Sequence, residues 1–164
     1  MLLFPTTHVA CQLINLKEAT DVTKILLTLL LSMSTASAFA LTFQVEHPYQ
    51  TIDLIHTETA IDSPQSLGSL TVSLLESHNV SYIGNEMGIH SIESTPFGDA
   101  AIEIISDVEM RVYGWCFIVD GEIPETLAGK TVITASTQRI SWFYAYAHYL
   151  EGEWLSYCTP APRG

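Results

Sequence analysis

Basic residues are scarce in this chain of 164 residues, which has 6 Lys+Arg against 18 Asp+Glu and a formal net charge of −12. Such a field repels phosphate groups at range, so it argues against a nucleic-acid-binding protein and against binding to an anionic membrane. We expect no acidic partner for the same reason. A basic partner or a bound cation is permitted but not implied, because many soluble proteins are acidic for solubility alone.

Signatures of catalytic and nucleotide-binding proteins are also missing. No Gly-x-Ser-x-Gly elbow occurs, no cysteine beyond residue 40 lies in a nucleophile signature, and no glycine-rich loop of the phosphate-cradling type is present. Internal repeats and low-complexity runs are absent as well. Because 48% of the residues are apolar, the chain can still bury a sizeable core. We therefore expect one globular domain that is not an enzyme.

The first 40 residues have the three parts of a secretory signal peptide. Lys24 supplies the positive charge, residues 25–31 form an apolar run, and a zone of small residues follows, with cleavage expected after Ala38 or Ala40. We therefore predict a leader and signal peptide over residues 1–40 and a mature protein that is periplasmic or secreted.

An uncleaved membrane anchor is the alternative for this segment. Residues 25–41 carry no charge, but this run is at the short end of the ~17–25 residues that a spanning helix needs, and its second half is rich in Ser, Thr and Ala. We therefore expect no stable membrane insertion after signal cleavage.

Charged residues upstream of the signal also lead us to expect that translation starts near Val22, at an alternative initiation codon.

Two cysteines, Cys116 and Cys158, remain once the leader is removed. An export signal and an even number of cysteines predict one disulfide bond in an oxidising compartment. Closing a loop as long as the segment between Cys116 and Cys158 stabilises a fold by about 4 kcal/mol in the chain-entropy model. Two unpaired cysteines are the alternative. A metal-binding pair is disfavoured because no His or Cys follows or precedes either cysteine at ligand spacing.

Two long segments predict the centre of a β-sheet. Residues 110–119 are rich in β-branched and aromatic side chains and end in an Asp-Gly turn signal, which is typical of a central strand. Residues 139–150 are its expected partner. The bulky side chains of this second strand fall on one face: Ile140, Trp142, Tyr144 and Tyr146.

Shorter elements are predicted around these strands. Alternating polarity at residues 41–46 and 51–56 predicts a hairpin. Ser63-Pro64 predicts the start of a helix that ends at His78-Asn79 and packs a leucine stripe, Leu67 to Leu75, on the sheet. We expect short strands at 89–92 within a loop over 82–98, at 101–105, at 131–135 and at 153–158, and a flexible tail over 159–164.

Gly114-Trp115 lies in a strand that runs through Val119 into Asp120-Gly121, and Ile140, Trp142 and Tyr144 follow in a later strand. This pattern resembles the bacterial domain family related to the C-terminal domain of transcobalamin and intrinsic factor. The resemblance covers residues 41–158 and implies an α+β, β-grasp-like fold, a mixed sheet with one packed helix. The family's Asp-Gly-Asp-like turn before the last strand is replaced here by Ser136-Thr137-Gln138.

Cobalamin is implied as a ligand by this resemblance alone. In the vitamin carriers the domain caps cobalamin together with a separate helical domain, and the present chain has no such helical domain. We otherwise expect no cofactor.

Aromatic residues of the two central strands are the candidate ligand-binding residues. On a sheet face that the helix leaves uncovered, they would form a platform for a flat small molecule such as a corrinoid, a glycan or a protein partner. The alternative is that they fill the core, since a single helix leaves much of the sheet to be covered by large side chains. The candidates are Tyr113, Trp115, Trp142, Tyr144 and Tyr146, with Trp154 as a further member of the group.

The expected function is that of an exported, noncatalytic binding or interaction domain. One alternative is a divalent-metal-dependent enzyme that uses His148, Glu151 and Glu153, although residues that flank Gly152 are typical of a solvated turn. The other is a structural envelope protein whose sheet edge pairs with another chain.

Overall fold

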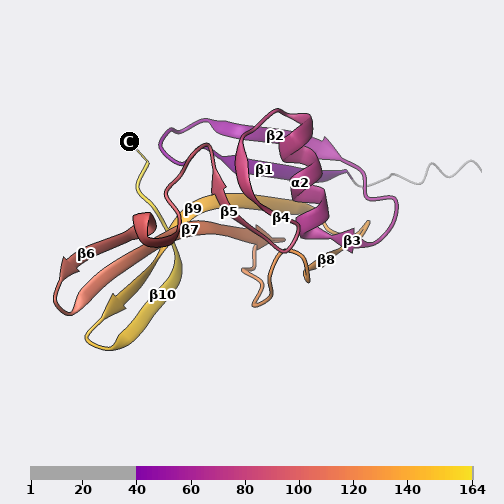
Figure 1. The fold of residues 1–164 in the computed structure, drawn as a ribbon. Helices are drawn as coiled ribbons and strands as arrows, with labels where there is room; N and C mark the ends of the chain where they lie inside the picture. Colours follow the sequence, from indigo (N-terminus) through magenta and orange to yellow (C-terminus); the bar gives the residue numbers. More distant parts are fainter. Residues whose placement is uncertain (1–39, 164) are drawn as a thin grey trace, which may run out of the picture. The chain divides into compact units, whose positions relative to one another are not determined.

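The structure is a computed structural model that describes residues 40–163. The predicted signal and the expected start of translation lie outside the described residues. The described part is an α+β domain with a mixed sheet and one α-helix, as expected from the sequence (Figure 1). No helix in it is long and apolar enough to cross a membrane. In chain order the elements are β1 (Leu41–Glu46), β2 (Asp53–Thr59), β3 (Gln65–Ser66), α2 (Leu67–Ser77), β4 (Tyr82–Asn85), β5 (Gly88–Ile92), the 3-10 helix η1 (Gly98–Ala101), β6 (Ile102–Ser106), β7 (Glu109–Val119), β8 (Val132–Ile133), β9 (Arg139–Leu150) and β10 (Glu153–Pro160).

The main sheet has the order β2-β1-β9-β7-β6, and β10 also pairs with β9. β7 occupies one edge of β9 from Ile140 to Leu150. β1 and β10 therefore share the other edge: β1 pairs in parallel with Arg139–Trp142, and β10 pairs antiparallel with Ala145–Leu150. β9 is thus the central strand, and only its pairing with β1 is parallel among the described strands.

The prediction of the central antiparallel pair is confirmed, because β7 and β9 pair from Glu109 opposite Leu150 to Val119 opposite Ile140. Asp120 and Gly121 form the tight turn at the end of β7, with φ values of 50° and 91°. The Asp120 carboxylate also accepts the backbone N–H groups of Gln138 and Arg139 at 2.9 and 2.8 Å. One turn residue therefore closes β7 and fixes the start of β9.

The predicted helix exists, but its start was placed wrongly at Ser63-Pro64. α2 begins at Leu67, with Ser66 as the N-cap, and the Ser66 hydroxyl accepts the N–H of Ser69 at 3.0 Å. Gln65 and Ser66 pair with β8, which keeps these residues extended and delays the helix. The leucine stripe packs inward as expected, and Leu67, Leu70 and Leu75 are buried.

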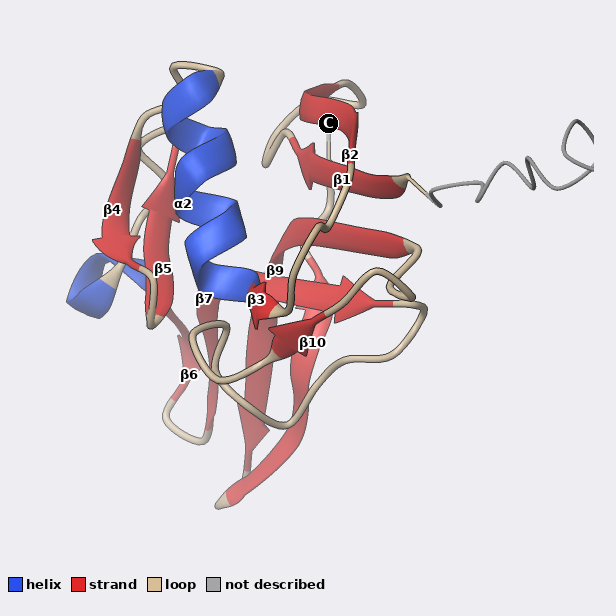
Figure 2. Cartoon of the chain, turned by 90° about the vertical axis from the view of Figure 1, so that its right-hand side faces the viewer, coloured by secondary structure: helices blue, strands red, loops and turns tan. Residues whose placement is uncertain are grey.

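α2 lies on one face of the sheet, beside the β4–β5 hairpin (Figure 2). The Glu86 backbone approaches the first turn of α2 so closely that position 68 must be glycine. A Cβ there would lie 1.7 Å from the carbonyl oxygen of Glu86. The hairpin itself is a correction: the sequence predicted one strand in a loop, whereas β4 pairs with β5. β4 was missed because its side chains are mostly exposed, so it has no alternating apolar pattern.

The core lies between α2 and the β1, β2 and β9 strands. Its largest buried side chain is Trp142, which is 2% exposed and donates its indole N–H to the Thr71 hydroxyl at 3.1 Å. The Thr71 hydroxyl in turn donates to the carbonyl of Leu67 at 2.8 Å. The helix and the central strand are thus joined by a satisfied polar contact within an apolar core.

β10 confirms the predicted last strand, and Glu151 and Gly152 form its turn with φ values of 51° and 97°. Cys116 and Cys158 are joined in the predicted disulfide, with a Cα–Cα distance of 6.0 Å. The chain stays paired beyond Cys158, because β10 continues to Pro160 and the N–H of Ala161 donates to the Tyr144 carbonyl at 3.0 Å. The predicted boundary of a flexible tail at residue 159 is therefore wrong.

Two hairpins, β6–β7 and β9–β10, project away from the part of the sheet that α2 covers (Figure 1). We call this projecting part the distal half: β6, β10, residues 109–114 of β7 and residues 145–150 of β9. The helix-covered half contains β1, β2, α2 and the remaining residues of β7 and β9. The same two central strands therefore pass from a covered sheet into an uncovered one.

Candidate functional site

Aromatic side chains form a ladder on the α2 side of the central strands. The β7–β9 register places them opposite one another, and side chains two residues apart in a strand share a face. The ladder starts beneath the helix and continues into the distal half. From the helix outward, the cross-strand pairs are Phe117 with Trp142, Trp115 with Tyr144, and Tyr113 with Tyr146.

The inner rung belongs to the core. The ring of Phe117 lies 4.9 Å from that of Trp142, and the helix covers Trp142 almost completely. A ligand could touch Trp142 only by displacing α2. The structure therefore places this predicted ligand-binding residue in the core, because the helix packs on the inner end of the strand.

The middle rung is only partly covered. Trp115 is half-buried and donates its indole N–H to the Thr95 hydroxyl at 2.8 Å, which fixes the ring. Its ring centroid lies 5.6 Å from that of Tyr144. The fluorescence of Trp115 should therefore respond to a change in the surroundings of Tyr144.

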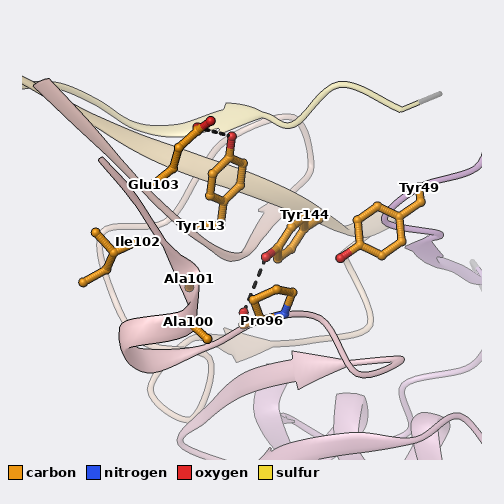
Figure 3. A pocket seen from close by; sticks show the side chains of 8 residues that line it. All are labelled: Tyr49, Pro96, Ala100, Ala101, Ile102, Glu103, Tyr113 and Tyr144. Carbon is orange, nitrogen blue, oxygen red and sulfur yellow. Dashed lines mark hydrogen bonds between the residues drawn. The ribbon is translucent and has the colours of Figure 1, made fainter. Parts of the chain in front are cut away.

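Tyr144 and Tyr113 form one wall of a cleft of about 320 Å³ (Figure 3). Their rings are stacked, with centroids 5.9 Å apart and an interplanar angle of 22°. Tyr49, from the loop between β1 and β2, meets the edge of Tyr144 at 6.3 Å. The rest of the lining comes from the segment before β6 and from its start: Pro96, Ala100, Ala101, Ile102 and Glu103.

Both wall phenols are hydrogen-bonded. The Tyr113 hydroxyl donates to Glu103 at 2.8 Å, and the Tyr144 hydroxyl donates to the Pro96 carbonyl at 3.4 Å. Burial, with smaller contributions from Tyr49 and Tyr113, raises the pKa of Tyr144 to about 12. Burial and the bond to Glu103 raise the pKa of Tyr113 as well. Both side chains are therefore neutral phenols at neutral pH, suited to stacking and hydrogen bonding.

The outer rung forms a charged end of the ladder. The Arg111 guanidinium lies over the Tyr146 ring, 4.9 Å from its centroid, and its Nη1 is 3.6 Å from the Glu103 carboxylate. Glu103 therefore faces Tyr113 and Arg111 together. Tyr146 supports Arg111 and is not part of the cleft lining.

A second cavity, of about 520 Å³, lies along the same ladder and is also lined by Tyr113. Its remaining lining includes Trp115, His90 of β5 and Phe97 of the following loop. Phe97 is 47% exposed, so its ring is available for contact. Tyr113 thus borders both cavities.

Sequence reasoning identified the wall residues Tyr113 and Tyr144 but missed Tyr49, Pro96 and the η1 alanines. Tyr49 had one usable signal, its place in the predicted turn between residues 41–46 and 51–56, since binding residues are often carried by loops. The alanines of η1 had none, because their place at the cleft depends on how the loop after β5 crosses the sheet.

The candidate metal site is not assembled. His148 is bonded through Nε2 to Glu109 at 2.9 Å, whereas Glu151 belongs to the β9–β10 turn and Glu153 begins β10. No group of three or more His, Cys, Asp or Glu residues among residues 40–163 could hold a metal ion.

The fold and the cleft define a small disulfide-linked α+β domain with an aromatic cleft at one side of its central strands. Searches against family models, curated proteins and solved structures found no match. The resemblance to the transcobalamin C-terminal domain, and cobalamin as a ligand, therefore stay predictions.

Proposed function

We propose that the protein is an exported, noncatalytic binding domain that stacks the apolar face of a ligand ring on Tyr113, whose own ring is held by Tyr144. The cleft is the basis of the proposal. One wall is aromatic, the residues of the floor are small and apolar, and the Glu103 carboxylate lies at the edge. A ring with an apolar face and a hydroxyl or amide edge has the complementary chemistry, because the face stacks and the edge donates to Glu103. A sugar or a planar heterocycle meets this description.

The order of the elements supports the finer fold assignment that goes with this function. A first hairpin, then a helix, then a long strand, β9, placed parallel to β1 in the middle of the sheet is a β-grasp-like arrangement. We propose this arrangement for the domain. It agrees with the resemblance to the transcobalamin C-terminal domain, which makes a corrinoid one of the planar ligands to test.

The disulfide supports the proposal of export. Structural disulfides persist in oxidising compartments and are rare in the cytosol. The bond between Cys116 and Cys158, together with the signal pattern in residues 1–40, is the basis for placing the protein in the periplasm or outside the cell.

Titration of the purified protein with a panel of oligosaccharides, planar heterocycles and cobalamin tests the function. Tryptophan fluorescence and calorimetry are the two readouts, since one of the three tryptophans, Trp115, contacts the wall residue Tyr144. For a ligand that binds, we expect Tyr113→Ala to weaken binding by about tenfold, the effect of losing about 1.4 kcal/mol of ring stacking.

Tyr157→Ala is the matched control, because Tyr157 is 70% exposed and lies outside the cleft. The proposal is contradicted if a ligand binds equally well to the Tyr113→Ala variant, or if both variants lose affinity to the same extent.

A further inference from the structure

We propose that the distal half binds an extended, basic segment of a partner protein, which adds as a strand to the free edge of β6. This proposal does not depend on the ligand of the cleft. It rests on the composition of this edge, on the apolar row that starts there and on the charge of the domain.

β6 is the last strand of the main sheet, so one of its edges is unpaired within the described residues. All five of its residues are exposed, and three are isoleucines. Ile104 alone is 69% exposed. An exposed apolar edge of this kind is a template for pairing with another chain unless the protein blocks it.

The opposite edge of the same sheet is β2, whose side chains oppose pairing with another chain. β2 bears charged or polar side chains at most of its positions, including Asp53, His56 and Glu58, and the buried position among them is Ile55. β6 has a single charged residue, Glu103. The two edge strands therefore differ in their number of charged and polar side chains, one of the features that oppose pairing with another chain.

An apolar row crosses the distal half from β6 on the face opposite the aromatic ladder. The registers place Ile104 opposite Met110, Met110 opposite Tyr149, and Tyr149 opposite Trp154. Trp154 is 41% exposed and its ring lies 5.4 Å from that of Tyr149. A strand added beside β6 would extend this row with every second side chain, so the partner segment should alternate apolar residues with others.

The charge of the domain predicts which residues should alternate with the apolar residues in the partner segment. Acidic residues flank β6 in the chain: Asp99 precedes it, and Asp107 and Glu109 follow it. The basic residue of the β6–β7 hairpin is Arg111. Lysine or arginine at the alternate positions of a partner strand would therefore meet complementary charge. A bulge at Ile105 restricts regular pairing to the first residues of β6, so side-chain contacts must supply much of the affinity.

A second copy of this chain is the competing occupant of the edge. Each copy carries a formal net charge of −12, and antiparallel pairing of two β6 strands would bring the end that precedes Asp107 in one copy to the end that follows Asp99 in the other. Like-charge contacts of this kind oppose association. A basic partner is therefore the occupant that the charges favour.

The probe for the test is a synthetic octapeptide of alternating valine and lysine, titrated into the purified, oxidised protein and followed by NMR of backbone amides. We expect binding that shifts the amides of Ile102–Ile104 and weakens as NaCl is added. A peptide with glutamate in place of lysine, and one with four lysines followed by four valines, should bind at least about tenfold more weakly.

Two variants localise the effect. Ile104→Ser should weaken binding of the alternating peptide several-fold, whereas Ile123→Ser, at a 50% exposed site beyond the other end of β7, should not. Equal binding of the three peptides overturns the proposal. So does a concentration-dependent dimer, measured by sedimentation, that Ile104→Ser abolishes, since the edge would then belong to a second copy.

Discussion

The helix-covered half and the distal half share the strands β7 and β9, yet the same kind of side chain has opposite fates in them. Trp142 is 2% exposed beneath α2, whereas Trp154, on the neighbouring strand of the distal half, is 41% exposed. Ile140 is fully buried, and Ile104 is 69% exposed. The comparison shows that the apolar pattern of a strand makes it suitable for burial, while a covering element decides whether burial happens.

The cleft lies where the two halves meet. Tyr144 is the last buried aromatic residue of β9 on the ladder face, and Tyr113, its stacking neighbour on β7, is only partly covered. A fully covered ladder would leave no ring face for a ligand, and a fully exposed one would not fix the rings. At the boundary, the buried Tyr144, which is 7% exposed, therefore holds the ring of Tyr113, which is partly accessible.

Replacing the two tryptophans by alanine is the strongest test of the comparison. Trp142→Ala should lower the free energy of unfolding by about 3–5 kcal/mol, because it leaves a cavity under α2 and removes the partner of Thr71. Trp154→Ala should cost about 1 kcal/mol, because a large part of its ring is already in water. Urea unfolding measures both values. Equal losses would mean that the distal half has a core of its own.

Removing the disulfide tests how the distal half is held to the rest of the sheet. The bond joins β7 to β10, whose sequence separation is 42 residues, and its loss should destabilise the fold by about 4 kcal/mol in the chain-entropy model. We expect the Cys116→Ser/Cys158→Ser variant to lose protection of the β10 amides first in hydrogen exchange, since few side chains cover β10. Simultaneous loss of protection in α2 would contradict the division into two halves.

Alkaline pH should have a smaller effect, localised at the boundary between the halves. The pKa of Tyr144 is about 12 in the folded protein and about 10 in an unfolded chain, so its neutral form is favoured by folding. This contribution is complete below about pH 10 and is lost as the pH rises to about 12.

Urea unfolding across this pH range should therefore show a steeper loss of stability for the native sequence than for Tyr144→Phe. Tyr157→Phe, at an exposed phenol, is the control. Parallel curves for the native sequence and Tyr144→Phe would show that the cleft does not shield this residue.

Much of the fold followed from local patterns. The long strands β7 and β9, the first hairpin, the presence of the helix, the last strand and the disulfide were all predicted, because each has a strong signal in alternation, leucine spacing, turn residues or cysteine number. The start of the helix was predicted wrongly because two serines could act as its cap, and only the pairing of Ser66 with β8 decides between them.

The candidate site was predicted only in part. Tyr113 and Tyr144 could be found from the alternation of the strands, whereas Tyr49 and Pro96 come from loops whose paths no periodic pattern describes. Gly68 is a similar case, since a glycine inside a helix has no visible reason in the sequence until Glu86 is found against it.

By itself the sequence determined which residues alternate to the same face of each strand, where the chain turns and which cysteines were available to pair, because these are properties of neighbouring residues. Only the tertiary structure decided which part of that aromatic face α2 covers, since coverage depends on contacts between segments far apart in the chain. That decision buries Trp142 and leaves Tyr113 and Tyr144 at a cleft, and the order of the strands leaves Ile104 at a free edge.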